Sequence, residues 1–180
     1  RAPFRLAEGA DEATLAAAFD AFCDVADVPA PRLSIDRLGP FFALVARDHP
    51  PLMDLATKAV RHFEELRAPL TPADRARRNP DALDERGREL LNTYGYPHVM
   101  ERFTFHMTLS GKVADSDAAS VRTAAEDHFS GVIGEPQRLV LAIFRERESG
   151  SPFEVMRLTP SARAQPAVAA APFAARDRTP

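Results

Sequence analysis

The chain has 180 residues, of which 45% are hydrophobic and 27% are charged, and its formal net charge is -3. This length accommodates one sizeable domain or two small lobes, and the composition is ordinary for a globular protein. Because the small negative charge provides no general attraction for nucleic acid or an anionic membrane, phosphate binding has to come from local clusters of arginine. An extended nucleic-acid ligand is therefore not expected.

Residue usage also bears on the cellular compartment. Cys23 is the only cysteine, so an internal disulfide and a cysteine-based zinc site are excluded. No apolar stretch approaches the length of a membrane span, and the first residues are too acidic for a signal peptide. Among the 23 basic residues only Lys58 and Lys112 are lysines, a bias typical of GC-rich bacterial genomes. These features predict a cytoplasmic bacterial protein without a membrane partner.

Hydrophobic periodicity and turn residues predict a mixed succession of helices and strands. In the first part of the chain we expect a strand over residues 2–7, a helix from about Asp11, strands over 31–38 and 41–47, and a helix over 50–67. In the second part we expect short helices over 71–78 and 81–95, a strand over 103–111, a helix over 115–129, and strands over 138–145 and 153–158. The fold class predicted by these elements is α+β.

The order strand, helix, strand, strand occurs twice at similar spacings. It predicts two pseudo-repeated lobes, residues 1–66 and 103–158, joined by a helical connecting segment over 67–102. Residues 159–180 are rich in Ala and Pro and contain few large apolar side chains, which predicts a disordered tail.

The repeat aligns Arg1 with Ser110. The element that matches residues 106–109 would then lie in the residues immediately before Arg1, so the first lobe is expected to lack its N-terminal strand here. Strand parity agrees with this alignment, because Arg1 and Arg5 would continue the face on which His106 lies.

The stretch FTFHMTLSG, residues 103–111, combines a core face with a chemically active one. Side chains alternate along a strand, so Thr104, His106, Thr108 and Ser110 would share one face, opposite an apolar one. Histidine can give or take a proton near neutral pH, and a hydroxyl two residues on can bind a phosphate oxygen at the same place. The alternative is a sheet histidine hydrogen-bonded to a neighbour, beside a threonine that suits a strand by its shape.

The sequence Phe105-His106-Met107-Thr108-Leu109 in the second repeat resembles the motif of the two-histidine phosphoesterase superfamily, whose members carry one such motif in each lobe. With the phrases RAPFRLAEG, LRAPLT and YGYPHV, the chain looks like a branch of bacterial proteins associated with phosphonate-utilisation operons. The resemblance covers the chain to about Leu158. It implies a bilobal α+β fold in which each lobe is an antiparallel sheet with helices outside, and in which the two motifs face a central cleft.

The activity that the resemblance implies is metal-independent hydrolysis of a small cyclic or linear phosphodiester. His106 would be one of two acid/base histidines, and Thr108 would donate a hydrogen bond to a non-bridging phosphate oxygen. The first His-x-Thr motif is absent from this chain. The chain by itself is therefore expected to be catalytically impaired.

Six further residues are candidates for contact with a substrate: Arg1, Arg5, Arg67, Tyr94, Tyr96 and Ser110. The arginines would supply positive charge to a phosphate, Arg67 on resemblance only. The tyrosines could stack on a base or a sugar ring, although such tyrosines more often pack on the body of a protein. The sequence has no metal-ligand spacing and no Gly-rich phosphate loop, so neither a metal nor a cofactor is predicted.

Three functions remain open at this point. The first is a phosphodiesterase that hydrolyses a small cyclic phosphate diester in phosphonate catabolism, the setting that the resembling branch suggests. The second is a 2′,3′-cyclic-nucleotide or RNA-end phosphodiesterase. The third is a non-catalytic protein that binds a phosphate metabolite or an RNA end. Except where the ligand is an RNA end, each of these three functions has a small phosphorylated molecule as its partner.

Overall fold

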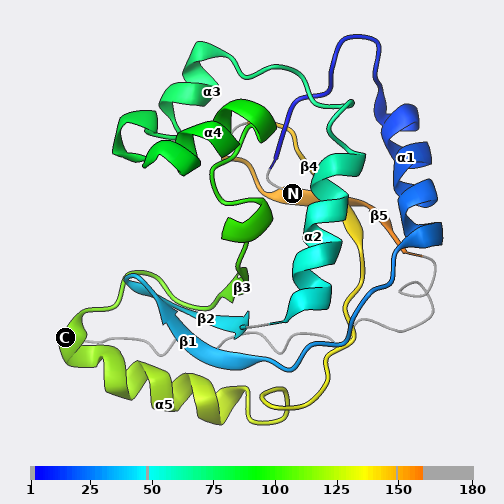
Figure 1. The fold of residues 1–180 in the computed structure, drawn as a ribbon. Coiled ribbons are helices and arrows are strands. Elements are labelled where there is room, and N and C mark those ends of the chain that lie inside the picture. The colour runs from blue at the N-terminus through cyan, green and yellow to red at the C-terminus, as the bar shows by residue number, and fades with distance from the viewer. Residues whose placement is uncertain (1–2, 48, 149, 160–180) are drawn as a thin grey trace.

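Figure 1 shows the fold in a computed structural model, which describes residues 3–47, 49–148 and 150–159. Arg1 and the predicted tail beyond Thr159 lie outside the described residues. The longer helices are α1 (Glu12–Val25), α2 (Pro50–His62), α4 (Glu85–Tyr94) and α5 (Ala118–His128). The short ones are α3 (Pro72–Ala76), η1 (Pro80–Ala82), η2 (Met100–Arg102) and η3 (Asp115–Asp117). The strands are β1 (Ser34–Leu38), β2 (Phe41–Ala46), β3 (Phe105–Thr108), β4 (Ala142–Glu146) and β5 (Phe153–Leu158).

The helices begin where the local sequence supplies a cap. Asp11 accepts a hydrogen bond from the Thr14 amide at the start of α1, with an N···O distance of 2.8 Å. At α3, Thr71 and Asp74 form a capping box in which each side chain bonds the other residue's backbone amide. Because these caps satisfy amide groups that the helix itself leaves without partners, the helix starts were predictable from sequence.

The strands form two antiparallel sheets. One sheet has the order β1-β2-β3, and the other is the hairpin β4-β5. β3, which comes from the second predicted lobe, pairs with β2 of the first, so the larger sheet combines strands from both repeats. Within residues 3–7, which the structure describes, the predicted strand over residues 2–7 is reduced to a single bridge, in which Leu6 pairs with Arg67. The α+β class with antiparallel sheets is confirmed.

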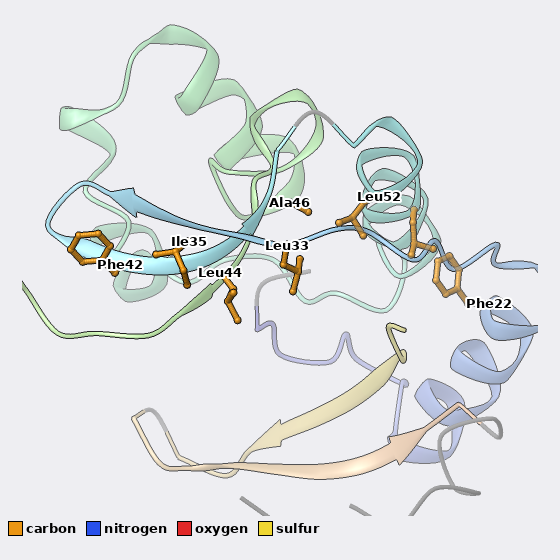
Figure 2. Packing of buried hydrophobic residues seen from close by; sticks show 8 residues of the cluster. Phe22, Leu33, Ile35, Phe42, Leu44, Ala46 and Leu52 are labelled. Atoms are coloured by element: carbon orange, nitrogen blue, oxygen red, sulfur yellow. The ribbon is translucent and has the colours of Figure 1, made fainter. Parts of the chain in front are cut away.

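The main core lies on one face of the larger sheet. Figure 2 shows the buried side chains that form it, with Phe42, Leu44 and Ile35 on the strands. α5 runs along this face, as Figure 1 shows, and Arg122 of α5 donates from Nη1 to the Ile35 carbonyl at 3.0 Å. α5 therefore packs on this face of the larger sheet and not on the opposite one.

The hairpin β4-β5 is held to α1 by charge. Arg157 of β5 forms a bidentate pair with Asp20 of α1, with an Nε···Oδ1 distance of 2.6 Å, and Arg145 of β4 pairs with Glu12. α5 thus packs against the larger sheet, and α1 is held to the hairpin by two ion pairs. No helix among the described residues is long and apolar enough to cross a membrane.

One face of the hairpin carries apolar side chains that nothing in the described residues covers. Phe144 and Val155 are register partners, and Phe153 follows on the same face as Val155. All three are more than half exposed. No third strand is hydrogen-bonded to this hairpin in the described part of the chain, whereas β2 has a neighbour on both sides. In the described residues, the larger sheet thus has a central strand with two neighbours, whereas the hairpin has two edge strands and an exposed apolar face.

Candidate functional site

β3 presents His106 and Thr108 on the face of the larger sheet that α5 does not cover. The register pairs His106 with Val45 and Thr108 with Ala43, and both β3 side chains are exposed. Side chains that lie directly opposite each other in an antiparallel pair point to the same face. Phe105 and Leu109 pack against the core, while Met107 on the same side is 42% exposed because β3 is an edge strand. The alternation expected for this strand is present.

A backbone contact determines the tautomer of His106. Its Nδ1 lies 2.8 Å from the carbonyl oxygen of Thr104. A carbonyl only accepts hydrogen bonds, so Nδ1 carries the proton and donates it in this contact. In the neutral imidazole Nε2 then has the free lone pair, which is the form needed to take a proton from a nucleophile.

Arg47 and Asp36 form an ion pair on this same face. Asp36 is the register partner of Ala43, which pairs with Thr108, so Asp36 is on the face of Thr108. Arg47 lies in the turn directly after β2 and reaches Asp36 from there. Arg47 Nε donates to Asp36 Oδ2 at 2.5 Å. Partial burial raises the pKa of Asp36, but hydrogen bonds from the Arg37 amide and from Arg47 outweigh it and leave that pKa below its ordinary value.

The sequence analysis missed Arg47. The strand before it gives no alternating signal, because Ala43 and Val45 are as deeply buried as residues 42, 44 and 46. What could not be read from the sequence is that β2 pairs with the histidine strand, which aligns Asp36, the partner of Arg47, with Thr108.

Ser110 has a structural position. Its hydroxyl oxygen accepts from the Phe42 amide at 2.9 Å and the hydroxyl donates to the Gly111 carbonyl at 2.8 Å. These bonds extend the pairing of β2 with the chain after β3, and they use the hydroxyl's donor and one of its two acceptor lone pairs.

The other predicted contact residues gather around α3 and α4. Arg67 and Leu70 line a pocket of about 290 Å³ together with Pro69, Arg75, Leu91 and Asn92, and a smaller adjoining hollow is lined by Arg67, Tyr94 and Tyr96 among others. Neither His106 nor Thr108, both of which the structure describes, lines either of them. Arg67, Tyr94 and Tyr96 therefore lie at a different place from the histidine motif, and Arg1 is outside the described residues.

Arg67 and Arg5 are held by local partners. Arg67 donates to Glu64 from Nε at 2.9 Å and to the Thr93 carbonyl from Nη2 at 3.2 Å, and only 12% of its side chain is exposed. Arg5 donates to the Pro69 carbonyl at 2.9 Å and to Asp74 at 3.3 Å. Both arginines connect neighbouring chain segments.

The two tyrosines pack on the second hydrophobic cluster, which consists of Val60, Leu90, Val99 and Met100. The guanidinium of Arg78 lies 4.8 Å from the ring centre of Tyr96, and the His98 ring lies 5.5 Å from it. Tyr96 is thereby stacked within the protein.

The remaining histidines have other environments. His49 caps α2, with Nδ1 accepting from the Leu52 amide at 3.3 Å, and Nε2 of His62 lies 2.9 Å from the Ala18 carbonyl. The ring of His128 packs edge-on against Phe129. No group of three or more His, Cys, Asp or Glu side chains suited to a metal ion occurs in the part of the chain that the structure describes.

Comparison with known proteins gives a family and two relatives. A family model described as "Protein of unknown function (DUF1045)" matches residues 1–154. A protein of Janthinobacterium sp. (strain Marseille) is 36% identical over 162 residues, which cover 85% of this chain and 35% of the relative. A protein of Laribacter hongkongensis (strain HLHK9) is 33% identical over 159 residues, which cover 88% of this chain and 37% of the relative.

Both relatives are named ribose 1,5-bisphosphate phosphokinase PhnN. The chain spans little more than a third of the length of these curated relatives. No solved structure matches the chain significantly.

Proposed function

The chain belongs to the DUF1045 family, and we propose that it forms part of a metal-independent phosphodiesterase of the two-histidine type that hydrolyses a small phosphodiester. His106 transfers a proton, and Thr108 donates a hydrogen bond to a non-bridging phosphate oxygen. The observation that carries the proposal is the Nδ1 contact of His106 with the Thr104 carbonyl, because it leaves Nε2 of this exposed side chain as a proton acceptor beside the exposed hydroxyl of Thr108.

The chemistry needs a second proton-transfer group. A diester is cleaved when a base takes a proton from the attacking water and an acid gives one to the leaving oxygen, on opposite sides of phosphorus. His49, His62 and His128 are engaged elsewhere. The proposal therefore places the second His-x-Thr strand before Arg1 in a longer polypeptide, where the predicted internal repeat would put it.

The hairpin β4-β5 supports this placement. In the larger sheet, β2 of one repeat pairs with the histidine strand of the other. By the same rule, β5 would pair with the histidine strand of the first repeat. The uncovered apolar face at Phe144, Phe153 and Val155 and the missing third strand agree with such an addition. The result would be a bilobal protein with two facing motifs.

The names of the two relatives bear on the substrate. Both names refer to a phosphorylated ribose. This chain has no Gly-rich phosphate-binding loop of the kind that kinases use, so phosphoryl transfer from a nucleotide is not proposed for it. The substrate proposed is a cyclic phosphate of ribose formed during phosphonate breakdown, because it is both a phosphorylated ribose and a phosphodiester.

A non-catalytic binding protein is the second candidate. It is favoured by the fact that His106 is the one histidine on its sheet face among the described residues. Such a protein would hold a phosphate metabolite or an RNA end without turnover.

The test is the hydrolysis rate of the longer natural protein with a ribose cyclic phosphate and with 2′,3′-cyclic nucleotides. His106→Gln should lower the rate with the preferred substrate by about 10²- to 10⁴-fold, the usual contribution of one acid/base group. His128→Gln, a histidine that packs on Phe129, is the matched control and should keep the rate. An unchanged rate in His106→Gln would overturn the proposal. Calorimetric binding without product over hours would establish the binding protein instead.

A further inference from the structure

The ion pair of Arg47 and Asp36 leaves a cation available on the face of His106. Nε of Arg47 is bonded to Asp36, and no described residue is recorded as a partner of its two Nη nitrogens. The Arg47 side chain is 54% exposed and that of Asp36 is 30% exposed, so the cation is the outer member of the pair. The two Nη groups form the fork that binds two oxygens of a phosphate at once.

The register sets the spacing between this fork and the proposed catalytic residues. Asp36, Ala43 and Thr108 stand side by side on three neighbouring strands. Adjacent strands are about 4.8 Å apart, so the backbones of Asp36 and Thr108 are separated by about 10 Å. Ala43, the small residue between them, is only 1% exposed, whereas the side chains of Thr108 and Arg47 on either side reach the surface.

Other arginines near this sheet have different positions. Arg37 donates to the Val113 carbonyl at 2.9 Å and to Asp115 at 2.7 Å. Arg122 lies over the Phe42 ring, 5.4 Å from its centre, donates from Nη1 to the Ile35 carbonyl, and places Nη2 3.9 Å from Oδ1 of Asp36. Arg37 and Arg122 thus use their Nη nitrogens on other residues, whereas Arg47 contacts Asp36 through Nε.

We propose that Arg47 binds the non-bridging phosphate oxygens of the substrate and that Asp36 is the positioning residue that holds Arg47 in place. The identity of the substrate in this inference rests on the proposed function. The binding of phosphate by Arg47 does not depend on it. Phosphate would be held between the Nη groups of Arg47 and the hydroxyl of Thr108, with the Nε2 of His106 alongside. A dianionic or diester phosphate is the ligand class that this arrangement selects.

The first experiment measures binding of inorganic phosphate to the longer natural protein by calorimetry. Arg47→Gln should weaken binding by about 10- to 100-fold, the effect of removing a charge-assisted bidentate contact. Arg47→Lys should give an intermediate loss, because the ammonium keeps the charge without the fork. Arg77→Gln is the matched control, since Arg77 is 60% exposed and also paired with an aspartate, Asp74. Wild-type affinity in Arg47→Gln, or no phosphate binding by the unaltered protein, would overturn the inference.

A second variant separates binding from a structural role of the ion pair. Asp36→Asn keeps an oxygen that can accept from Arg47 Nε but removes a negative charge near the bound phosphate. The phosphate affinity of Asp36→Asn should therefore be equal to or higher than that of the unaltered protein. If Asp36→Asn and Arg47→Gln lose affinity equally, the pair only supports the fold and the inference is wrong.

Kinetics distinguish this inference from the proposed function. With a turned-over diester, Arg47→Gln should raise KM more than it lowers kcat, whereas His106→Gln should lower kcat. If no diester is hydrolysed but phosphate binding still depends on Arg47, the proposed function fails and the inference stands.

Discussion

Arginine pairs hold several carboxylates of this protein in the charged form. At Asp84, the N-cap of α4, Nη1 and Nη2 of Arg102 donate to the two carboxylate oxygens at 2.7 and 2.6 Å. The Gly87 amide donates to Oδ1 at 2.8 Å. The Arg102 contact first, and then the Gly87 amide, lower the pKa of Asp84 from its ordinary 3.8 to about 2. Glu101 is lowered to a similar pKa by Arg86.

Asp84→Asn should therefore alter how stability depends on acid. A carboxylate whose pKa is depressed in the folded state stabilises the fold above its unfolded pKa, and this contribution is lost as the pH falls through the folded pKa. The free energy of unfolding of the unaltered protein should fall between about pH 4 and pH 2 more steeply than that of the variant, because asparagine still caps the helix but does not titrate. Urea denaturation at pH 7, 4, 3 and 2.5 measures this.

Asp27→Asn, an exposed residue between α1 and β1, serves as the control for Asp84→Asn. Parallel acid profiles for the unaltered protein and Asp84→Asn would show that the Arg102 pair does not contribute.

At the scale of elements, the end of α4 connects a helix to the segment that leads to β3. Gly95 ends α4 with a φ of 75°, and its amide donates to the Leu91 carbonyl. A Cβ at this position would lie 3.1 Å from Nη1 of Arg67, the arginine that also bonds the Thr93 carbonyl. The left-handed backbone and the close approach of Arg67 both favour glycine here.

Gly95→Ala should lower the free energy of unfolding by about 1–2 kcal/mol, the usual penalty for an L-residue in the left-handed region. Gly111→Ala is the control, because a Cβ at Gly111 meets nothing within 4 Å and its φ is not positive. Urea denaturation of both variants tests the difference. Equal stabilities would mean that the end of α4 adapts at no measurable cost.

At the scale of the whole molecule, the larger sheet and the hairpin differ in burial. Phe42 on the central strand β2 is 1% exposed and lies under the guanidinium of Arg122. Phe144 on β4 is 56% exposed. The same substitution at these two positions compares a complete core with an uncovered sheet face.

Phe42→Ala should lower the free energy of unfolding by about 3–5 kcal/mol, as expected when a buried phenyl ring is removed. Phe144→Ala in this 180-residue chain should cost far less, within about 0.5 kcal/mol. In the longer polypeptide, Phe144→Ala should cost clearly more than in this chain if a further strand completes that sheet. An equal small cost in both would contradict the addition of a strand at β5. Chemical denaturation of the two lengths of protein measures both values.

Features that depend on neighbouring residues were predictable from the sequence. The caps at Asp11, Thr71 and Asp84 and the glycine end of α4 act within one helical turn, and their residue types are specific to such positions. The apolar pattern of residues 2–7 was compatible with a strand. The described residues 3–7 form a single bridge instead, because the segment beside them is the turn near Arg67 and not a strand. Local pattern alone does not supply a pairing partner.

The sequence by itself determined the α+β class and the alternation that turns His106 and Thr108 away from the core, since both follow from side-chain periodicity along one segment. The tertiary structure decided that β3 joins β2 and so brings Arg47 and Asp36 onto the face of His106. It also decided that Arg67 donates to the Thr93 carbonyl and that Tyr96 stacks on Arg78, so both residues contact other parts of the protein, away from that face. These outcomes depend on contacts between residues far apart in the chain, whose energies come from strand pairing and burial and leave no periodic trace in the sequence.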